Sequence, residues 1–418
     1  MFHFFVPESV ADRVAAARKA VVLTGGFSGC WNFGDLLQLA GAMEWHRKIH
    51  NDAVLLPTVD LANVRTATAL ERLIRWLHTD VMIYLYAEQD DQAPFEIRIG
   101  GQRFRRFERG PERIMLHVYG GGFLNRFWAT WQLRMIEDLH HTIHPQVYLI
   151  SGQQIDPHVA DRVAAHIESY RPRLVGCRDE QSVEALARHG VAARFSGDDA
   201  WEALQACAED IKHGTAAVTG EGERSSFGLH LNLSWYVHAE DVAERNGTVV
   251  GQRIRSELVD LFAALQARFG SDARPLVVLA FPDPRQEVAD SLCAIEKTGF
   301  TRIFPHVRCV DLVGLLEARR FAELGPWVEN LALFISCSYH TALLFTMLRI
   351  PTYLLAFNQY YAQKRASLGL THGGAADFRT VDLEERLRAQ SLWVEHVSSQ
   401  RQEWLDLLSG IVVEAFGG

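Results

Sequence analysis

Cysteine is scarce in this sequence, and positive charge is not in excess. The six cysteines among the 418 residues lie far apart with no CxxC pair, so we exclude a disulfide-stapled mini-protein and interpret them as reduced, mostly buried apolar residues. The 42 basic and 51 acidic residues give a net charge of −9, which disfavours a nucleic-acid partner. A small anionic ligand stays compatible, because a pocket can be locally positive inside an acidic protein.

Long hydrophobic runs are also missing. No stretch approaches the roughly 20 apolar residues that cross a bilayer, and the richest run, residues 341–357, contains Arg349 and Pro351. The first seven residues are apolar, but they lack the charged region, apolar region and cleavage site of a secretory signal. We therefore expect a soluble protein in the cytoplasm.

What remains is the composition of a globular chain. Hydrophobic residues make up 48% and charged residues 22% of the sequence. This balance supports a large core and excludes disorder and collagen-like repeats. The length predicts two or three domains.

Strand-like runs alternate with helical periods along most of the chain. Continuous apolar strands separated by amphipathic helices are typical of a parallel sheet covered on both faces. Residues 95–107 alternate around Gly100 and Gly101 and predict an inserted hairpin. In the first half we predict strands at residues 20–24, 53–56, 81–86, 114–119, 146–150 and 174–176, and helices at 35–50, 66–78, 127–141, 158–170 and 181–189.

The second half repeats this alternation. Residues 209–225 are polar and without an apolar period, so we predict a linker there. Beyond it we predict strands at residues 227–233, 275–281, 303–304, 331–335 and 352–356, and helices at 252–269, 287–298, 311–320, 341–348, 360–368 and 381–416. The expected fold class is α/β, with two doubly wound, Rossmann-like domains facing a cleft. These are residues 1–208 and 226–380, and the helices of 381–418 are expected to pack back on the first domain.

Ligands of such sheets lie beyond the carboxyl ends of the strands, where the sequence has two glycine-rich segments. Residues 25–35 contain four glycines, and Asn32 and Asp35 there can hydrogen-bond hydroxyl groups. The alternative is a turn with Asp35 as the N-cap of a helix. Residues 120–122 are three glycines between a predicted strand and a predicted helix, which indicates an anion site at the helix N-terminus or, alternatively, a tight turn.

Two further strand ends carry charged or titratable side chains. Arg178 follows a strand, where a guanidinium can pair with a carboxylate or phosphate; the alternative is a structural ion pair with Asp198 or Asp199. His340 begins a helix beside Ser338, and a neutral histidine there suits proton transfer at neutral pH. The alternative for His340 is a polar group of the core with satisfied hydrogen bonds.

The order and spacing of these segments resemble the polysaccharide pyruvyl transferase family. The resemblance covers about residues 21–370, although 203–330 match only in pattern. One departure is Ser338, where some members of the family have arginine and other branches have serine. The matching segments are N-x-G-D at 32–35, G-G-G at 120–122, a Ser-to-Pro turn at 151–157, R-D-x-x-S at 178–182, Gly190-Val191 with Asp198, S-Y-H at 338–340, Ile350-Pro351, and Lys364 with Gly369.

The resemblance implies a fold similar to the glycosyltransferase B type and a defined reaction. Members of the family transfer pyruvate from phosphoenolpyruvate to two hydroxyls of a saccharide, forming a cyclic ketal and releasing phosphate, in the synthesis of cell-surface polysaccharides and glycoconjugates. One group must exchange protons while others hold the carboxylate and phosphate of the donor. Phosphoenolpyruvate is a co-substrate, and no cofactor or metal is required.

For this chain the resemblance implies His340 as acid and base and Arg178 as the group that holds the donor. Lys364 would add a cation near the donor; the alternative is a solvated lysine on a helix. The other residues assigned to the donor's anionic oxygens are Gly120, Gly121, Gly122 and Ser338.

On the acceptor side, Asn32 and Asp35 would position hydroxyl groups, and Trp31 would stack on a sugar ring. The acceptor would be a saccharide or a lipid-linked saccharide, and only through it would the protein associate with a membrane. Neither the identity of the acceptor nor an oligomeric state follows from the pattern. Trp128 and Trp131 belong either to an interface or to the core, and we favour the core.

Two other functions stay open from the residues. The first is a glycosyltransferase that uses a nucleotide-sugar donor on the same architecture, for which Glu317 or Glu329 could bind the donor ribose. The second is a binding or assembly protein that has kept the fold without the chemistry, to which Ser338 gives some weight. Intact Arg178 and His340 argue against this second alternative.

Overall fold

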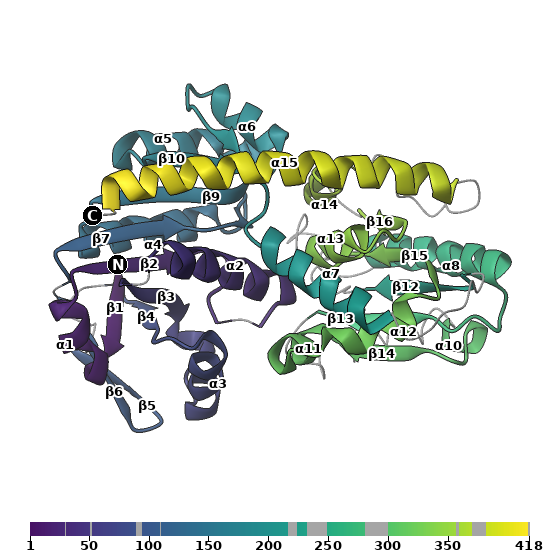
Figure 1. The fold of residues 1–418 in the computed structure, drawn as a ribbon, viewed down its shortest axis with the longest axis horizontal. Coiled ribbons are helices and arrows are strands. Elements are labelled where there is room, and N and C mark those ends of the chain that lie inside the picture. Colours follow the sequence, from purple (N-terminus) through teal and green to yellow (C-terminus); the bar gives the residue numbers. More distant parts are fainter. Residues whose placement is uncertain are drawn as a thin grey trace. The chain divides into compact units, whose positions relative to one another are not determined.

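The chain folds into two compact units, and each contains one sheet (Figure 1). The computed structural model describes residues 1–29, 31–50, 52–88, 94–108, 110–215, 224–231, 249–280, 300–356, 359–369 and 382–416, without the side chains of 249–255 and 359–360. The first unit comprises Met1–Cys30, Asp35–Ala203 and Ser398–Gly418, and the second comprises Trp31–Gly34 and Leu204–Val397. The predicted α/β class, with two parallel-sheet domains, is confirmed.

The first unit is built on an 11-stranded sheet in the order β11-β10-β9-β7-β2-β3-β4-β1-β6-β5, with β8 paired to β9. Strands β11 to β4 of this order are parallel, and β1, β6 and β5 are antiparallel. The strands are β1 (Phe2–Pro7), β2 (Lys19–Thr24), β3 (Val54–Asp60), β4 (Met82–Tyr86), β5 (Glu96–Ile99), β6 (Gln102–Arg106), β7 (Arg113–Val118), β8 (Gly121–Leu124), β9 (Val147–Ile155), β10 (Leu174–Cys177) and β11 (Arg194–Phe195).

The central strands of this sheet are buried along their whole length, which explains their continuous apolar sequence. All six residues of β2 and all nine of β9 are buried. The predicted hairpin is confirmed as β5 and β6, joined at Gly100 and Gly101. Strand β1 was not predicted, because it pairs with β4 and β6, about 80 to 100 residues further along the chain.

Helices cover the sheet of the first unit (Figure 1). They are α1 (Glu8–Ala16), α2 (Phe33–Ile49), α3 (Ala67–Leu77), α4 (Ala129–Ile143), α5 (Ala160–Tyr170) and α6 (Glu180–Ala187), and the first unit also includes the C-terminal part of α15 (Leu383–Phe416). The glycines of 120–122 lie between a strand and a helix, as predicted, but they are not a simple turn at the helix N-terminus. Gly121 and Gly122 begin β8, which extends the sheet beside β9, and α4 begins only at Ala129.

The second unit holds a five-stranded parallel sheet in the order β14-β13-β12-β15-β16. Its strands are β12 (Ser226–His230), β13 (Leu276–Leu279), β14 (Arg308–Asp311), β15 (Leu331–Ser336) and β16 (Thr352–Leu354). Its helices are α8 (Val249–Phe269), α10 (Phe300–Ile303), α11 (Leu312–Ala318), α12 (Gly325–Val328), α13 (Tyr339–Met347) and α14 (Gln359–Ala366), with most of α7 (Trp201–Thr215) and the first part of α15.

Two sequence predictions for the second half are wrong. Residues 303–304 are not a strand: Ile303 ends α10, and Phe300 and Phe304 are both buried one helical turn apart, so the short apolar run belongs to a helix face. The predicted linker at 209–225 begins inside α7, where Ile211 continues the buried face of the helix. Residues 216–223, and the helix predicted at 287–298, lie outside the described residues.

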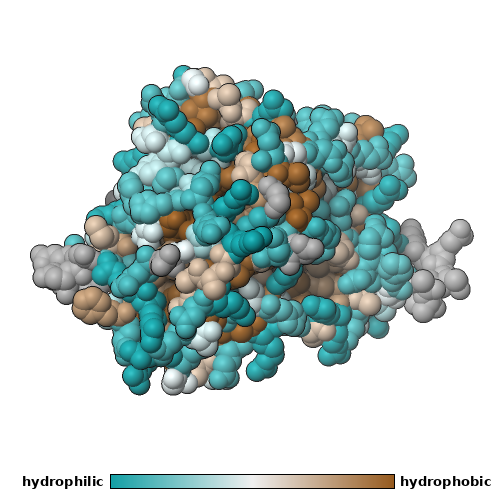
Figure 2. Space-filling view, turned by 60° about the vertical axis from the view of Figure 1, so that its left-hand side comes forward, coloured by the Kyte–Doolittle hydropathy of each residue, from teal (hydrophilic) through white to brown (hydrophobic). Residues whose placement is uncertain are grey.

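The surface also departs from one prediction. Trp128 and Trp131 are not core residues, because each is 43% exposed. The cores themselves are aliphatic and aromatic and separate for the two sheets. On the face shown in Figure 2, hydrophilic side chains cover most of the surface and hydrophobic residues appear in patches between them.

Candidate functional site

The carboxyl edge of the first sheet carries a buried cluster of charges. Strands β10 and β11 end at Cys177 and Phe195, and parallel strands end at the same edge of a sheet. Arg178 follows the first of these strands, and Asp198 and Asp199 follow the second within four residues. This is the edge where the sequence predicted an anionic ligand.

Arg178 is bound within the protein. Its Nη1 lies 3.4 Å from a carboxylate oxygen of Asp198, and both side chains are at most 1% exposed. The other Nη donates a hydrogen bond to Gln154, and Gln38 donates to both Asp198 oxygens at 3.1 Å. The structure therefore has the alternative arrangement of Arg178, a structural ion pair with Asp198.

The residues after Arg178 have structural tasks that account for their spacing. Asp179 is the N-cap of α6, since its carboxylate accepts a hydrogen bond of 2.8 Å from the Ser182 amide. The Ser182 hydroxyl accepts from the Ile155 amide at 2.9 Å and so ties α6 to the end of β9. Burial raises the pKa of Asp179, and the neighbouring Arg178 partly offsets this rise.

The glycine run binds the carboxylate of Asp199. The Gly120 amide donates a hydrogen bond of 2.6 Å to Asp199 Oδ2, and the Ser151 hydroxyl donates to the same oxygen. Gly152 lies against this oxygen with a φ of +62°, and a Cβ there would lie 2.6 Å from it. Only glycine fits both the backbone angle and the close approach.

The second cation of the cluster is Arg401, which the sequence analysis missed. It comes from α15, and its Nη1 lies 3.0 Å from Asp199 Oδ1. Its Nε and Nη2 donate to the two oxygens of Glu202 at 2.9 and 3.0 Å. Burial alone would lower the pKa of Arg401, but Glu202 and Asp199 raise it. About 200 residues separate Arg401 from its partners, so no local pattern could have identified it.

A chain of buried hydrogen bonds continues from Asp199 into the core. Ser151 Oγ lies 2.7 Å from His117 Nε2, and His117 Nδ1 lies 2.8 Å from His46 Nε2. Because Ser151 donates to a carboxylate, it must accept from His117, which in turn accepts from His46. Burial lowers the pKa of His117 to about 4, with Asp199 opposing the shift, and burial also lowers the pKa of His46.

This chain has the connectivity of a nucleophile, a base and an orienting group, yet it does not form a hydrolytic site. Ser151 is fully buried, and its proton is directed at Asp199 rather than at His117. A nucleophilic serine must give its proton to the base and be accessible to a substrate. We interpret the chain as a structural link between α2, β7 and β9.

The carboxyl edge of the second sheet is different in chemistry. Strand β15 ends at Ser336, whose hydroxyl accepts from the Ser338 amide at 2.8 Å. Thr341 donates to the Ser338 carbonyl at 3.1 Å and closes the loop. Ser338 is the N-cap of α13, but its side chain makes no capping hydrogen bond. The loop is therefore held by its neighbours, and the half-buried Ser338 hydroxyl is not used in the cap.

His340 lies in the first turn of α13 and is 9% exposed. A Cβ on Gly34 would lie 1.9 Å from its Nδ1, so the ring rests directly on the backbone of the Trp31–Gly34 segment, which belongs to this unit. Asn32 fixes that segment, because its side chain accepts a hydrogen bond of 2.9 Å from the Gly34 amide. Asn32 therefore supports the backbone on which the His340 ring rests.

His230, at the end of β12, is a second histidine of this edge that the sequence analysis missed. It pairs in register with Ser336 of β15. Its Nδ1 donates to the Val278 carbonyl at 2.9 Å, and burial lowers its pKa to about 4. It escaped notice because it lies inside the apolar run 227–233, which looked like an ordinary buried strand.

The remaining predicted residues lie apart from these contacts. Trp31 is 7% exposed, so a sugar could stack on it only after its ring is uncovered. Asp35 is half-buried in the first turn of α2; it is not the N-cap, because the helix begins at Phe33. Lys364 lies on α14 with its Nζ 5.3 Å from the ring centre of Tyr361.

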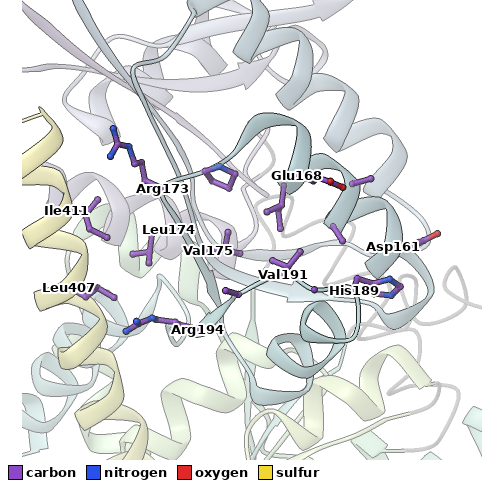
Figure 3. Close-up of a pocket in the computed structure, with 16 residues that line it drawn as sticks. Asp161, Glu168, Arg173, Leu174, Val175, His189, Val191, Arg194, Leu407 and Ile411 are labelled. Carbon is purple, nitrogen blue, oxygen red and sulfur yellow. The ribbon is translucent and has the colours of Figure 1, made fainter.

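A pocket of about 800 Å³ opens elsewhere on the first unit, at the amino ends of β10 and β11. Figure 3 shows Leu407 and Ile411 of α15 on one side and His189 and Asp161 on the other. No predicted site residue lines it. Ligands of doubly wound sheets bind at the opposite edge, so we do not assign the function to this pocket.

The described residues contain neither a membrane-spanning helix nor a cluster of metal-binding side chains. No described helix combines the length and the hydropathy that a membrane span requires. Within the same residues, no three His, Cys, Asp or Glu side chains gather in a way that could hold a metal ion.

Comparisons with known proteins give only distant matches. No family model matches the chain, and no curated protein matches it in sequence. Sucrose-phosphate synthase from Thermosynechococcus elongatus is similar at 10% identity and a TM-score of 0.48, covering 96% of this chain and 99% of that one. UDP-GlcNAc 2-epimerase from Neisseria meningitidis is similar at 12% identity and a TM-score of 0.42, and the match covers 95% of this chain and 99% of that one. UDP-GlcNAc 2-epimerase from Methanocaldococcus jannaschii is similar at 12% identity and a TM-score of 0.44, and the match covers 90% of this chain and 92% of that one. Likeness at this level says nothing about a reaction.

Proposed function

We propose that the chain is a glycosyltransferase that binds a nucleotide-sugar donor at the carboxyl edge of the second sheet, for the synthesis of a polysaccharide or glycoconjugate. The observation that carries the proposal is that His340 and the Ser338 hydroxyl, which makes no capping hydrogen bond, lie together at the N-terminus of α13. A helix N-terminus, a hydroxyl donor and an imidazole together suit the diphosphate of such a donor.

In this reaction the donor phosphate gains negative charge in the transition state. The acceptor hydroxyl oxygen forms a bond to the anomeric carbon, the bond from that carbon to the phosphate oxygen breaks, and the acceptor proton passes to a base. The helix N-terminus and an N–H of His340 would stabilise the leaving phosphate. Gly34, directly under the imidazole, would fix the direction in which His340 points.

The internal ion pair and hydrogen bond at the carboxyl edge of the first sheet favour a nucleotide-sugar donor over phosphoenolpyruvate. Phosphoenolpyruvate carries a carboxylate beside its phosphate, and the resemblance to pyruvyl transferases assigns Arg178 to that pair of anions. Arg178 is bound to Asp198 and the Gly120 amide to Asp199. A nucleotide-sugar needs neither group, because it has no carboxylate next to the reacting atom.

Pyruvyl transfer from phosphoenolpyruvate is the second candidate. The order of the segments at 32–35, 120–122, 178–182 and 338–340 supports it, and so does the contact between Gly34 and His340. His340 would then protonate the enol carbon, and Arg178 would exchange Asp198 for the donor.

Calorimetric titration tests both candidates. The purified chain is titrated with UDP-N-acetylglucosamine, UDP-glucose, GDP-mannose and phosphoenolpyruvate, and the titrations are repeated with His340→Ala and Arg178→Lys. Folding of each variant is checked by circular dichroism. His189→Ala, which changes a histidine that lines the pocket of the first unit, is the matched control.

Saturable binding of a nucleotide-sugar that His340→Ala weakens at least about tenfold, and His189→Ala leaves unchanged, supports the main proposal. Binding of phosphoenolpyruvate that Arg178→Lys abolishes supports pyruvyl transfer, because a point charge cannot replace a bidentate guanidinium. Binding of neither donor class contradicts both.

A further inference from the structure

Exposed aromatic rings gather around the start of α4. Tyr86, Phe127, Trp128 and Trp131 are 36%, 37%, 43% and 43% exposed, and we call these four residues the aromatic collar. Tyr86 ends β4, Phe127 and Trp128 lie between β8 and α4, and Trp131 is in the first turn of α4. Large exposed aromatic groups mark an interaction site when they occur together.

Two rings of the collar, those of Trp131 and Tyr86, pack against a buried neighbour and against each other. Trp131 packs edge-on against Phe2 with centroids 4.6 Å apart and lies 4.8 Å from Tyr86. Phe2 is buried, and its amide donates a hydrogen bond of 2.7 Å to Asp138 of α4. The Trp131 and Tyr86 rings therefore lose little conformational freedom when a ligand covers them.

Polar side chains that already interact with other residues of the protein border the collar. The guanidinium of Arg134 lies 5.2 Å from the centre of the Tyr86 ring. Arg126 donates to Asp156 Oδ2 at 3.1 Å and contacts His158 Nδ1 at 3.1 Å. The charge of Arg126 is thus balanced by Asp156, while the charge of Arg134 faces an aromatic ring, and the border offers directed donors and acceptors.

We infer that the aromatic collar binds a saccharide chain. Sugar rings present C–H groups on their faces and hydroxyls at their edges, so they stack on indole and phenol rings while their hydroxyls bond to polar groups at the border. In the proposed transferase the chain would be the acceptor, and only this last assignment rests on the proposed function.

The composition of the surface favours a saccharide over a lipid bilayer or a protein. The four residues of the collar are all aromatic. Met1, 46% exposed and hydrogen-bonded to Ala87 at 2.8 Å, is the one exposed aliphatic side chain described beside them, whereas the exposed Val259, Leu392 and Val413 lie on α8 and α15. A peripheral membrane surface draws on a cluster of cations for anionic lipids, whereas at this border Arg126 is paired with Asp156 and Arg134 stacks over Tyr86.

Affinity electrophoresis tests the inference without any donor. The chain is run in native gels that contain dextran, hydroxyethyl cellulose, xanthan or alginate, and its mobility is compared with that in a gel without polysaccharide. We expect at least one polymer to retard the chain, and Trp131→Ala and Trp128→Ala to weaken the apparent affinity at least about tenfold. Trp131→Tyr keeps an aromatic ring and should retain most of the affinity for the polymer. Leu392→Ala, at a residue 68% exposed on α15, is the control and should change nothing.

Three results would overturn the inference. The first is that none of the four polymers retards the chain, or that a polymer retards Trp131→Ala as strongly as it retards the unchanged chain. The second is sedimentation with phosphatidylglycerol vesicles that Trp131→Ala abolishes, which would assign the collar to a membrane. The third is a concentration-dependent dimer, seen in sedimentation velocity, that the same variant dissociates. Nucleotide-sugar titration of Trp131→Ala separates the two proposals, because donor binding should survive in this variant even if the collar binds no saccharide.

Discussion

The carboxyl edges of the two sheets occupy the same topological place and are used in opposite ways. At the edge of the first sheet, Arg178 and Arg401 are paired with Asp198 and Asp199 in the interior. At the edge of the second sheet, neutral hydroxyls and His340 surround a helix N-terminus. The comparison teaches that glycines and an arginine at strand ends indicate an anion, but that the anion can be a carboxylate of the protein itself.

Removing Asp199 should cause the largest loss of stability. Asp199→Ala leaves the buried charge of Arg401 with Glu202 alone and removes the acceptor of Gly120 and Ser151. We expect a loss of about 3–5 kcal/mol in the free energy of unfolding of the first unit. Hydrogen exchange of peptides from β7 and β9 in increasing urea measures this unit separately, which a two-unit chain requires. Asp199→Asn keeps an acceptor oxygen and should lose less; a loss below about 1 kcal/mol in Asp199→Ala would show that the cluster is not held by this carboxylate.

Acid should weaken the first unit through the histidine chain, and His230, whose pKa is likewise lowered to about 4, should act in the same direction in the second unit. The pKa of His117 is lowered to about 4 in the folded state, against about 6.5 when unfolded. The unfolded chain therefore takes up a proton first, and stability is full above about pH 6.5 and falls as the pH decreases toward 4, by about 3 kcal/mol for this histidine.

Urea unfolding of the first unit at several pH values between 7.5 and 4.5 measures this slope. The matched variant is His117→Gln, which keeps a donor and an acceptor but does not titrate, and its slope should be smaller by one proton. An unchanged slope in His117→Gln would mean that His117 binds its proton equally in both states.

Gly34→Ala probes the second edge through its contact with His340. A Cβ would lie 1.9 Å from the imidazole Nδ1, so the ring has to move. We expect donor binding to weaken at least about tenfold in calorimetry, with a stability loss of about 1–3 kcal/mol from overpacking. The control is Gly410→Ala in α15, where a Cβ would meet nothing within 4 Å. This variant should leave donor binding unchanged and raise the free energy of unfolding by about 0.5–1 kcal/mol. Full donor binding by Gly34→Ala would remove His340 from the donor site.

The smallest effect on stability is expected at Ser338. Its side chain makes no capping hydrogen bond in α13, so Ser338→Ala should change the free energy of unfolding by less than about 0.5 kcal/mol. Loss of a hydroxyl that contacts the donor should still weaken binding several-fold. The contrast with Asp199→Ala then separates a ligand-binding edge from a structural one. A large loss of stability in Ser338→Ala would contradict the comparison.

Most of the fold could be predicted from the local hydrophobic periods of the sequence. The predictions that were wrong or missing have physical causes. The alternation of strands and helices predicted both parallel sheets, because each strand is buried on two faces and each helix on one. Strand β1 was missed because its partners β4 and β6 lie far along the chain. The strand predicted at residues 303–304 is wrong because so short an apolar run shows no period, and Ile303 in fact ends α10.

The candidate site was readable in part. The sequence singled out Arg178 and His340 because both follow strands, and both do lie at carboxyl edges. It also named Asp198 as an alternative partner of Arg178, which the structure has. It could not select between a ligand and an internal partner, because that choice depends on residues that approach from elsewhere in the chain.

Local period and composition were enough to predict most strands and helices and the residues at strand ends. Which groups meet was decided by packing. Arg401 reaches Asp199 from the far end of the chain, and Gly34 reaches His340 across some 300 residues. Local patterns specify the face that a residue takes, whereas the partner on that face is fixed by packing between segments remote in sequence.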